Sequence, residues 1–113
     1  MLSQFSSPSR RHYARFETPE GVWAYWSCGG HCDTSLVRNL SAGGGFIQTR
    51  QPVGLGAKST IDFLIPEGRL RVEAVVRHVS SGLGFGLQFT AVEDGDRPQL
   101  AFLLNRLSHP SGR

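Results

Sequence analysis

Two arginines stand four residues apart near the start of the chain, in Arg11-His12-Tyr13-Ala14-Arg15, and Arg10 precedes them. A guanidinium group binds phosphate through paired hydrogen bonds, recognises the O6 and N7 edge of guanine and stacks on base planes, which an ammonium group does not do. The residues before them, 1–9, are polar and rich in serine. We therefore expect a flexible N-terminal arm, followed by arginines that can close over an anionic ligand.

A second group with binding chemistry is Asn39-Leu40-Ser41-Ala42-Gly43-Gly44. Asn39 and Ser41 are two residues apart, so on an extended backbone their side chains point the same way. An amide and a hydroxyl can together read the donors and acceptors of a base, and glycines let a backbone approach a ligand closely. A plain turn, and solvated charge for the arginines, are the alternative interpretations.

Groups for catalysis are scarce. No histidine is spaced so that it could serve a serine or cysteine nucleophile, and the carboxylates lie mostly in turns or near a helix start. We therefore expect no enzyme and no catalytic residue. Cys28 and Cys32 enclose His31, but a structural zinc site needs four ligands, so a flexible, reduced loop without a metal is predicted here.

The composition indicates one globular domain. The chain has 113 residues, 39% of them hydrophobic and 19% charged, which suffices for a core without disulfides. All basic residues except Lys58 are arginines, and the net charge of +3 favours anionic partners only slightly. No apolar run is longer than five residues, so we expect no membrane insertion and a cytoplasmic location.

Alternating apolar and polar residues predict short strands. The clearest run is 69–79, where the apolar residues at 70, 72, 74 and 76 share one face and Arg77 lies on the polar face. Trp23 and Trp26 are predicted to share a face and to pack in the core, with a protein-contact patch as the alternative. Further strands are expected at 13–17, 22–26, 35–40, 45–49, 61–65 and 83–89, separated by turns such as Pro19-Glu20-Gly21.

The pattern changes to helical spacing near the C-terminus. Asp96, Pro98 and Gln99 form a helix start of the capping-box type. Leucines at 100, 103, 104 and 107 then recur until Pro110, which predicts one amphipathic helix packed on the sheet. Six or seven short strands with one closing helix indicate an all-β fold, a small antiparallel barrel.

With these motifs in order on a small barrel, the sequence resembles the PilZ domain family. Arg11 and Arg15 match the family's Arg-x-x-x-Arg motif, Asn39 to Gly44 matches its Asp/Asn-x-Ser-x-x-Gly motif, and Gly84 to Phe89 looks like its last strand. The resemblance covers nearly all of the chain. It places the PilZ domain at 10–108, with 109–113 as a tail. One departure is the segment 17–38, which is longer than the family's usual first hairpin.

The resemblance implies a six-stranded barrel that binds the bacterial second messenger cyclic di-GMP. Carried over by position, Arg11 and Arg15 grip phosphates and guanines, Asn39 and Ser41 contact a guanine, and Gly44 keeps the loop open. Gly43 is a further candidate ligand-binding residue. Arg10 offers a third guanidinium, compatible with two ligand molecules per site. Arg77 is a further candidate contact, with a solvated strand residue as the alternative. No other cofactor is implied.

Three functions remain open at this point. The first is a cyclic di-GMP receptor or adaptor in which the ligand alters contact with a partner effector protein. The second is a ligand-blind PilZ-like interaction module, against which Arg11 and Arg15 argue. The third is a small basic barrel for nucleic acid, which the low and dispersed charge disfavours. A homodimer is compatible with all three.

Overall fold

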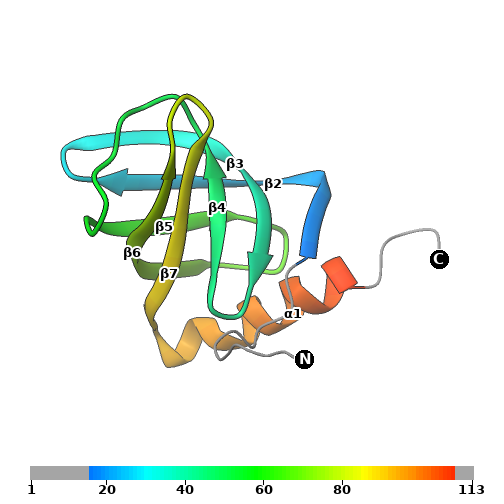
Figure 1. Ribbon diagram of the computed structural model, residues 1–113. Helices are drawn as coiled ribbons and strands as arrows, with labels where there is room; N and C mark the ends of the chain where they lie inside the picture. Colours follow the sequence, from blue (N-terminus) through cyan, green and yellow to red (C-terminus); the bar gives the residue numbers. More distant parts are fainter. Residues whose placement is uncertain (1–15, 109–113) are drawn as a thin grey trace, which may run out of the picture.

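Six antiparallel strands close into a barrel in the computed structural model, which describes the backbone of residues 16–108 and the side chains of residues 21–108 (Figure 1). Around the barrel the order is β2-β3-β4-β7-β6-β5, and β5 pairs again with β2. Together with the single helix of this region, the barrel confirms the predicted fold. The strands are β2 (Phe16–Cys28), β3 (His31–Ser41), β4 (Gly44–Gln48), β5 (Lys58–Leu64), β6 (Leu70–Ser80) and β7 (Gly84–Val92).

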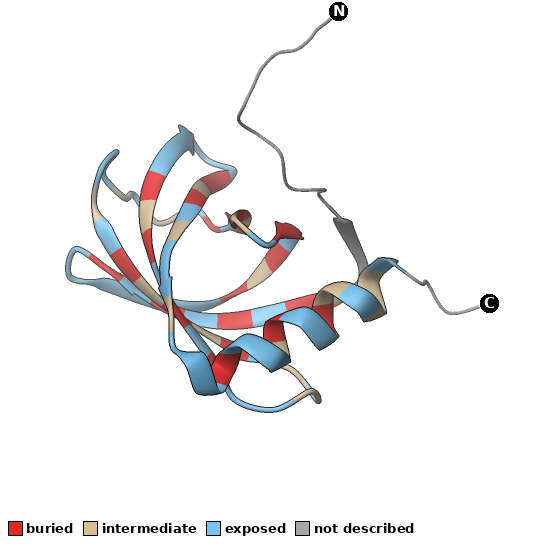
Figure 2. Cartoon of the chain, turned by 90° about the horizontal axis from the view of Figure 1, so that it is seen from below, coloured by how far each residue is buried: buried red, intermediate tan, exposed pale blue. Residues whose placement is uncertain are grey.

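Alternate residues of the strands point inward and form the core, as Figure 2 shows by the alternation of buried and exposed positions. At its centre the ring of Trp26 meets the ring of Phe85 edge to face, with the ring centroids 5.1 Å apart. The indole Nε1 of Trp26 donates a hydrogen bond of 2.9 Å to Ser35 Oγ, so this buried polar group is satisfied. The predicted inner face of β6 is confirmed: Leu70, Val72, Ala74 and Val76 are all buried.

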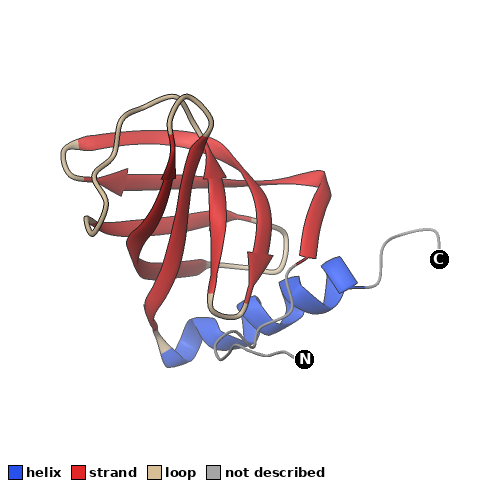
Figure 3. Ribbon diagram, viewed as in Figure 1, coloured by secondary structure: helices blue, strands red, loops and turns tan. Residues whose placement is uncertain are grey.

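β2 differs from the prediction, because the two short strands expected on either side of residues 19–21 form one bent strand (Figure 3). The predicted turn at 19–21 is wrong. The pairing register with β3 shifts between Glu17 and Val22, so a bulge absorbs these residues inside the strand. Residues 13–15 of the first predicted strand lie outside the described part of the chain.

The two tryptophans lie on opposite faces of β2. Trp26 is fully buried, whereas 49% of Trp23 is exposed on the outer surface beside Leu64, its register partner in β5. The expectation that both share a face is wrong, because side chains alternate along a strand and positions three apart point in opposite directions. The prediction that the tryptophans pack in the core is therefore confirmed for Trp26 and wrong for Trp23.

The segment around the cysteines is a regular hairpin rather than a flexible loop. Cys28 ends β2 and pairs with His31 at the start of β3, and only Gly29 and Gly30 lie between them. Both glycines have positive φ, 56° and 87°, which is the requirement of a two-residue turn that matches the twist of the strands. Both cysteines are free thiols, Cys28 buried and Cys32 exposed.

The helix lies across one end of the barrel in Figure 1. A short 3-10 turn, η1 (Asp94–Asp96), leads into α1 (Arg97–Ser108). Leu100 and Leu103 are buried against the barrel, as their helical spacing predicts. Within residues 16–108 we find no helix with the length and apolar character that a membrane crossing requires.

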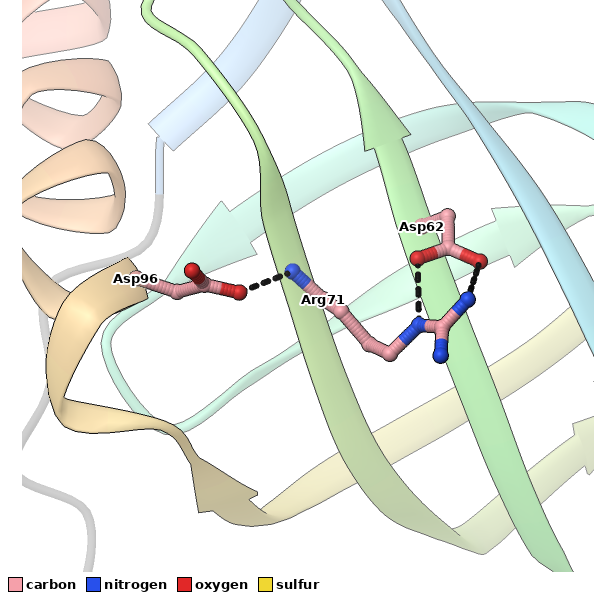
Figure 4. A network of polar contacts seen from close by, with 3 residues as sticks. All are labelled: Asp62, Arg71 and Asp96. Carbon is pink, nitrogen blue, oxygen red and sulfur yellow. Dashed lines mark hydrogen bonds and ion pairs between the residues drawn. The ribbon is translucent and has the colours of Figure 1, made fainter.

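The predicted capping box at the helix start is not formed. The carboxylate of Asp96 instead accepts a hydrogen bond of 3.0 Å from the backbone N–H of Arg71 on β6 (Figure 4). The side chain of Arg71 in turn forms a two-pronged ion pair with Asp62 on β5, at 2.7 and 3.0 Å. Gln99 donates to the carbonyl oxygen of Arg69 at 2.9 Å. The two polar residues of the predicted cap therefore attach the helix end to Arg71 of β6 and to Arg69, which directly precedes β6.

Candidate functional site

The hairpin between β3 and β4 carries the Asn-x-Ser-x-x-Gly motif, and Ser41 organises it. Ser41 is only 3% exposed. Its Oγ accepts hydrogen bonds from the backbone N–H of Gly43 at 3.1 Å and of Gly44 at 3.2 Å, and lies 3.3 Å from the carbonyl oxygen of Gly44. The hydroxyl thus satisfies two backbone donors of the turn, which gives Ser41 a role in shaping the hairpin that carries Asn39.

Gly44 holds two strands close together. It pairs with Gln88 of β7, and a Cβ atom on Gly44 would lie 2.0 Å from the carbonyl oxygen of Leu87. Gly43 contributes as well, because its carbonyl oxygen accepts a hydrogen bond of 2.8 Å from the N–H of Phe89. The expectation that Gly44 keeps the loop open is wrong. The absence of a side chain at Gly44 instead lets β4 lie close to β7.

A bulge in β3 turns two neighbouring side chains outward. Val37 pairs with Ile47 and Asn39 pairs with Phe46, so Arg38 is the extra residue on β3. Val37 and Leu40 are buried, while Arg38 and Asn39 between them face outward. The bulge therefore places Arg38 beside Asn39 on the outer surface.

Asn39 lines a groove of about 640 Å³ on this outer surface, at β3, β4 and the β6–β7 turn. The volume lies within the roughly 300–1,000 Å³ typical of small-molecule sites. Its described lining includes two arginines and no carboxylate. The lining residues are Arg38, Asn39, Phe46, Gln48, Thr49, Arg50, Gly82 and Leu83.

The chain that follows the arginine motif pairs with the strand that leads into this hairpin. Phe16, the first described residue, pairs with Leu40, and Glu17 pairs with Asn39. Arg10, Arg11 and Arg15 lie outside the described residues, but Arg15 directly precedes Phe16 in the chain. The residues that directly follow the arginine motif therefore pair with Asn39 and Leu40 of the second motif.

Arg77 lies on the same side of the barrel. A second bulge, between Val76 and His78 on β6, makes Arg77 the extra residue there. Its Nε donates a hydrogen bond of 2.7 Å to Gln88 Oε1, and Gln88 is the register partner of Gly44. Arg77, a predicted site residue, is therefore hydrogen-bonded to Gln88, the residue of β7 that pairs with Gly44 of the motif.

Sequence reasoning overlooked three groove residues: Arg38, Phe46 and Arg50. Phe46 and Arg50 could have been found from strand alternation, because positions 46, 48 and 50 share one face of an extended chain. Arg38 could not, because strict alternation would turn it away from Asn39, and only the bulge reverses this.

A second hollow, of about 710 Å³, lies at the other end of β3. There a hydrogen bond with the Cys32 thiol raises the pKa of Tyr25, and burial raises the pKa of Cys28 although a hydrogen bond with Ser59 opposes the shift. Among residues 16–108 no group of three or more His, Cys, Asp or Glu side chains is placed to hold a metal ion.

The structure is a small closed antiparallel barrel whose β3–β4 hairpin carries the Asn-x-Ser-x-x-Gly motif and whose first described strand follows directly after Arg15. The chain belongs to the PilZ domain family, whose model matches residues 9–106. A comparison of the sequence with curated proteins found no match.

The fold is similar to that of solved bacterial proteins. The chain is similar to the Bacillus subtilis inhibitor of motility MotI/DgrA, with a TM-score of 0.71 and 21% identity, covering 90% of this chain and 53% of that one. It is also similar to K. pneumonia MrkH in complex with c-di-GMP, with a TM-score of 0.70 and 18% identity, covering 94% and 55%. At these identities the likeness shows the fold alone. The chain spans about half the length of these proteins.

Proposed function

We propose that this PilZ domain is a receptor for cyclic di-GMP. The observation that carries the proposal is the pairing of Phe16 with Leu40, because Phe16 directly follows Arg15 in the chain and Leu40 lies within the Asn-x-Ser-x-x-Gly motif. In the proposal Arg10, Arg11 and Arg15 bind the phosphates and guanines, and Asn39 reads a guanine edge. Ser41, Gly43 and Gly44 hold the hairpin, and Arg77 adds a contact from β6.

The chemistry of the ligand fits these residues. Cyclic di-GMP carries two phosphates and two guanines, so its binding calls for guanidinium groups and base-edge readers together. A hydrogen bond to a charged group contributes about 1.5–3 kcal/mol. Three or four of them reach micromolar affinity after ordering costs of several kcal/mol.

In this proposal the protein acts in the cytoplasm and transmits a signal by binding the dinucleotide. It catalyses no reaction and needs no other cofactor. The ligand orders the arginine segment against the barrel and so changes the surface that an effector protein, or a second copy of the chain, meets. MrkH forms a complex with c-di-GMP and is a c-di-GMP-dependent transcription regulatory factor. This structural neighbour supports the ligand class and a regulatory output.

Isothermal titration with cyclic di-GMP tests the proposal. We expect saturable binding with a Kd in the micromolar range or below, and one or two ligands per chain. Absence of binding at about 100 μM ligand would overturn it. Two parallel titrations identify the other functions. Binding of a single-stranded oligonucleotide alone, weakened by salt, indicates a nucleic-acid barrel. No binding of either ligand indicates an interaction module.

A further inference from the structure

Phe46 forms an aromatic floor in the groove. It lies on the outer face of β4, between Asn39 of β3 and Gly86 of β7 in the pairing register. The ring lies against the glycines of β7: a Cβ on Gly84 would be 2.8 Å from Phe46 Cε2, and one on Gly86 would be 3.9 Å from Cδ1. Because β7 has no side chains at these two positions, the ring packs against its backbone and is partly buried there.

Two guanidinium groups from the barrel wall line the same groove. Arg38 is turned outward by the bulge, and its Nη1 donates a hydrogen bond of 2.7 Å to Gln48 Oε1. This contact orients the guanidinium group at the groove. Arg50 follows two residues after the end of β4, on the face that Phe46 and Gln48 share.

An aromatic ring between guanidinium groups suits a guanosine phosphate unit. Purines stack on aromatic side chains, and arginine binds phosphate through paired hydrogen bonds. Asn39 belongs to both the family motif and the groove, so a ligand that reaches Asn39 also reaches the groove. Phe16, which follows Arg15 in the chain, pairs with Leu40 at the Asn39 end of this surface, whereas Arg50 lies beyond the far end of β4.

We propose that this groove is a subsite for one guanosine phosphate unit of the dinucleotide, with Phe46 as the stacking surface and Arg38 and Arg50 as phosphate contacts. The inference rests on the proposed function and deepens it. In this proposal the ligand is held by the arginine motif and Arg38 at the Asn39 end of the groove and by Arg50 at the other end.

Calorimetric titration of four variants with cyclic di-GMP tests the subsite. Phe46→Leu keeps an apolar contact with β7 but removes the aromatic face, while Arg38→Gln and Arg50→Gln remove one charge each. We expect each to raise the Kd about tenfold, since losing a stacked base or a charged contact is worth roughly that factor. Lys58→Gln is the matched control, because β5 lies three strands from β4 in either direction around the barrel. Its Kd should stay within about twofold of the unmodified chain.

The outcomes separate this inference from the proposed function. If the unmodified chain binds and Arg15→Ala weakens binding, but all three groove variants bind as the unmodified chain does, the subsite is wrong and the receptor function stands. If the unmodified chain does not bind, both fail. Thermal unfolding checks that the variants are folded. Because Arg50 is exposed, Arg50→Gln still tests the subsite if Phe46→Leu is unstable.

Nuclear magnetic resonance tests the stacking directly. We expect a nuclear Overhauser effect between the Phe46 ring protons and a guanine H8, and its absence in the saturated complex would contradict stacking.

Discussion

Phe16 pairs with Leu40 across β2 and β3, so the first described residue of the barrel lies against the centre of the Asn39–Ser41 motif. Arg15 precedes Phe16 in the chain, and Asn39 and Ser41 flank Leu40. The arginine motif therefore ends one residue before the position that pairs with Leu40. This pairing is the structural reason to consider the two sequence motifs as parts of one candidate site.

Arg15→Ala should weaken cyclic di-GMP binding about 10- to 100-fold, the equivalent of one hydrogen bond between charged groups. The core described within residues 16–108 is built from other side chains, so the melting temperature without ligand should stay unchanged within about 2 °C. Calorimetry and thermal unfolding measure the two effects. Equal binding by Arg15→Ala and the unmodified chain would remove the arginine motif from the site.

Ser41→Ala should lower the free energy of unfolding by about 1–3 kcal/mol, because the backbone N–H groups of Gly43 and Gly44 lose their acceptor in a buried turn. Binding should weaken too, since the hairpin carries Asn39. Denaturant unfolding measures the first effect. Ser81→Ala, in the exposed turn before β7, serves as the control and should be neutral. A fully stable Ser41→Ala variant would show that the hydroxyl has no structural role.

Gly44→Ala should disrupt the barrel by separating β4 from β7. Its Cβ would lie 2.0 Å from the carbonyl oxygen of Leu87, a backbone atom that cannot yield without moving a strand. We expect a loss of at least about 3 kcal/mol, beyond the usual range for overpacking. Gly54→Ala is the matched control, because a Cβ there meets nothing within 4 Å. Similar stability of the two variants in denaturant unfolding would refute the explanation.

The ion pair of Glu67 with Arg106 should make stability depend on acid pH. Hydrogen bonds from Arg106 lower the pKa of Glu67 below its ordinary value of 4.5, so the folded state releases this proton more readily than the unfolded state. The contribution is therefore full above about pH 4.5 and is lost as the pH falls through the lowered pKa. We expect about 1 kcal/mol, since Arg106 is 36% exposed and Glu67 only 11%.

Denaturant unfolding of Glu67→Gln at several pH values checks this prediction. The variant should be less stable than the unmodified chain at pH 7, and the two should converge at strongly acid pH. Glu73→Gln, an exposed carboxylate on β6, is the control and should follow the unmodified chain. A constant difference across the pH range would contradict the assignment to Glu67.

Much of the fold was accessible from the sequence because burial imposes periodicity. A strand with one solvent-exposed face alternates apolar and polar residues, so the inner face of β6 could be predicted residue by residue. The helical spacing of the leucines likewise predicted which face of α1 packs on the barrel. The two binding motifs were visible as well, since guanidinium, amide and glycine chemistry is encoded in residue type. Their identity and order also carried the resemblance to the PilZ family.

The sequence did not disclose how the backbone departs from regular spacing. A bulge adds one residue to a strand without a reliable signature, so the outward turn of Arg38 and the continuity of β2 through residues 19–21 depend on pairing with neighbouring strands. The same holds for Asp96, whose type suits a helix cap but whose carboxylate finds the N–H of Arg71 instead.

The sequence by itself determined which residues are capable of chemistry and which face of each regular element is apolar, because both are local properties of the chain. Only the tertiary structure decided that Ser41 is buried as a scaffold for its hairpin, that Gly44 permits contact between β4 and β7, and that Phe46 lies on the glycines of β7. These roles depend on atoms far away in the sequence, and closure of the barrel is what brings them together.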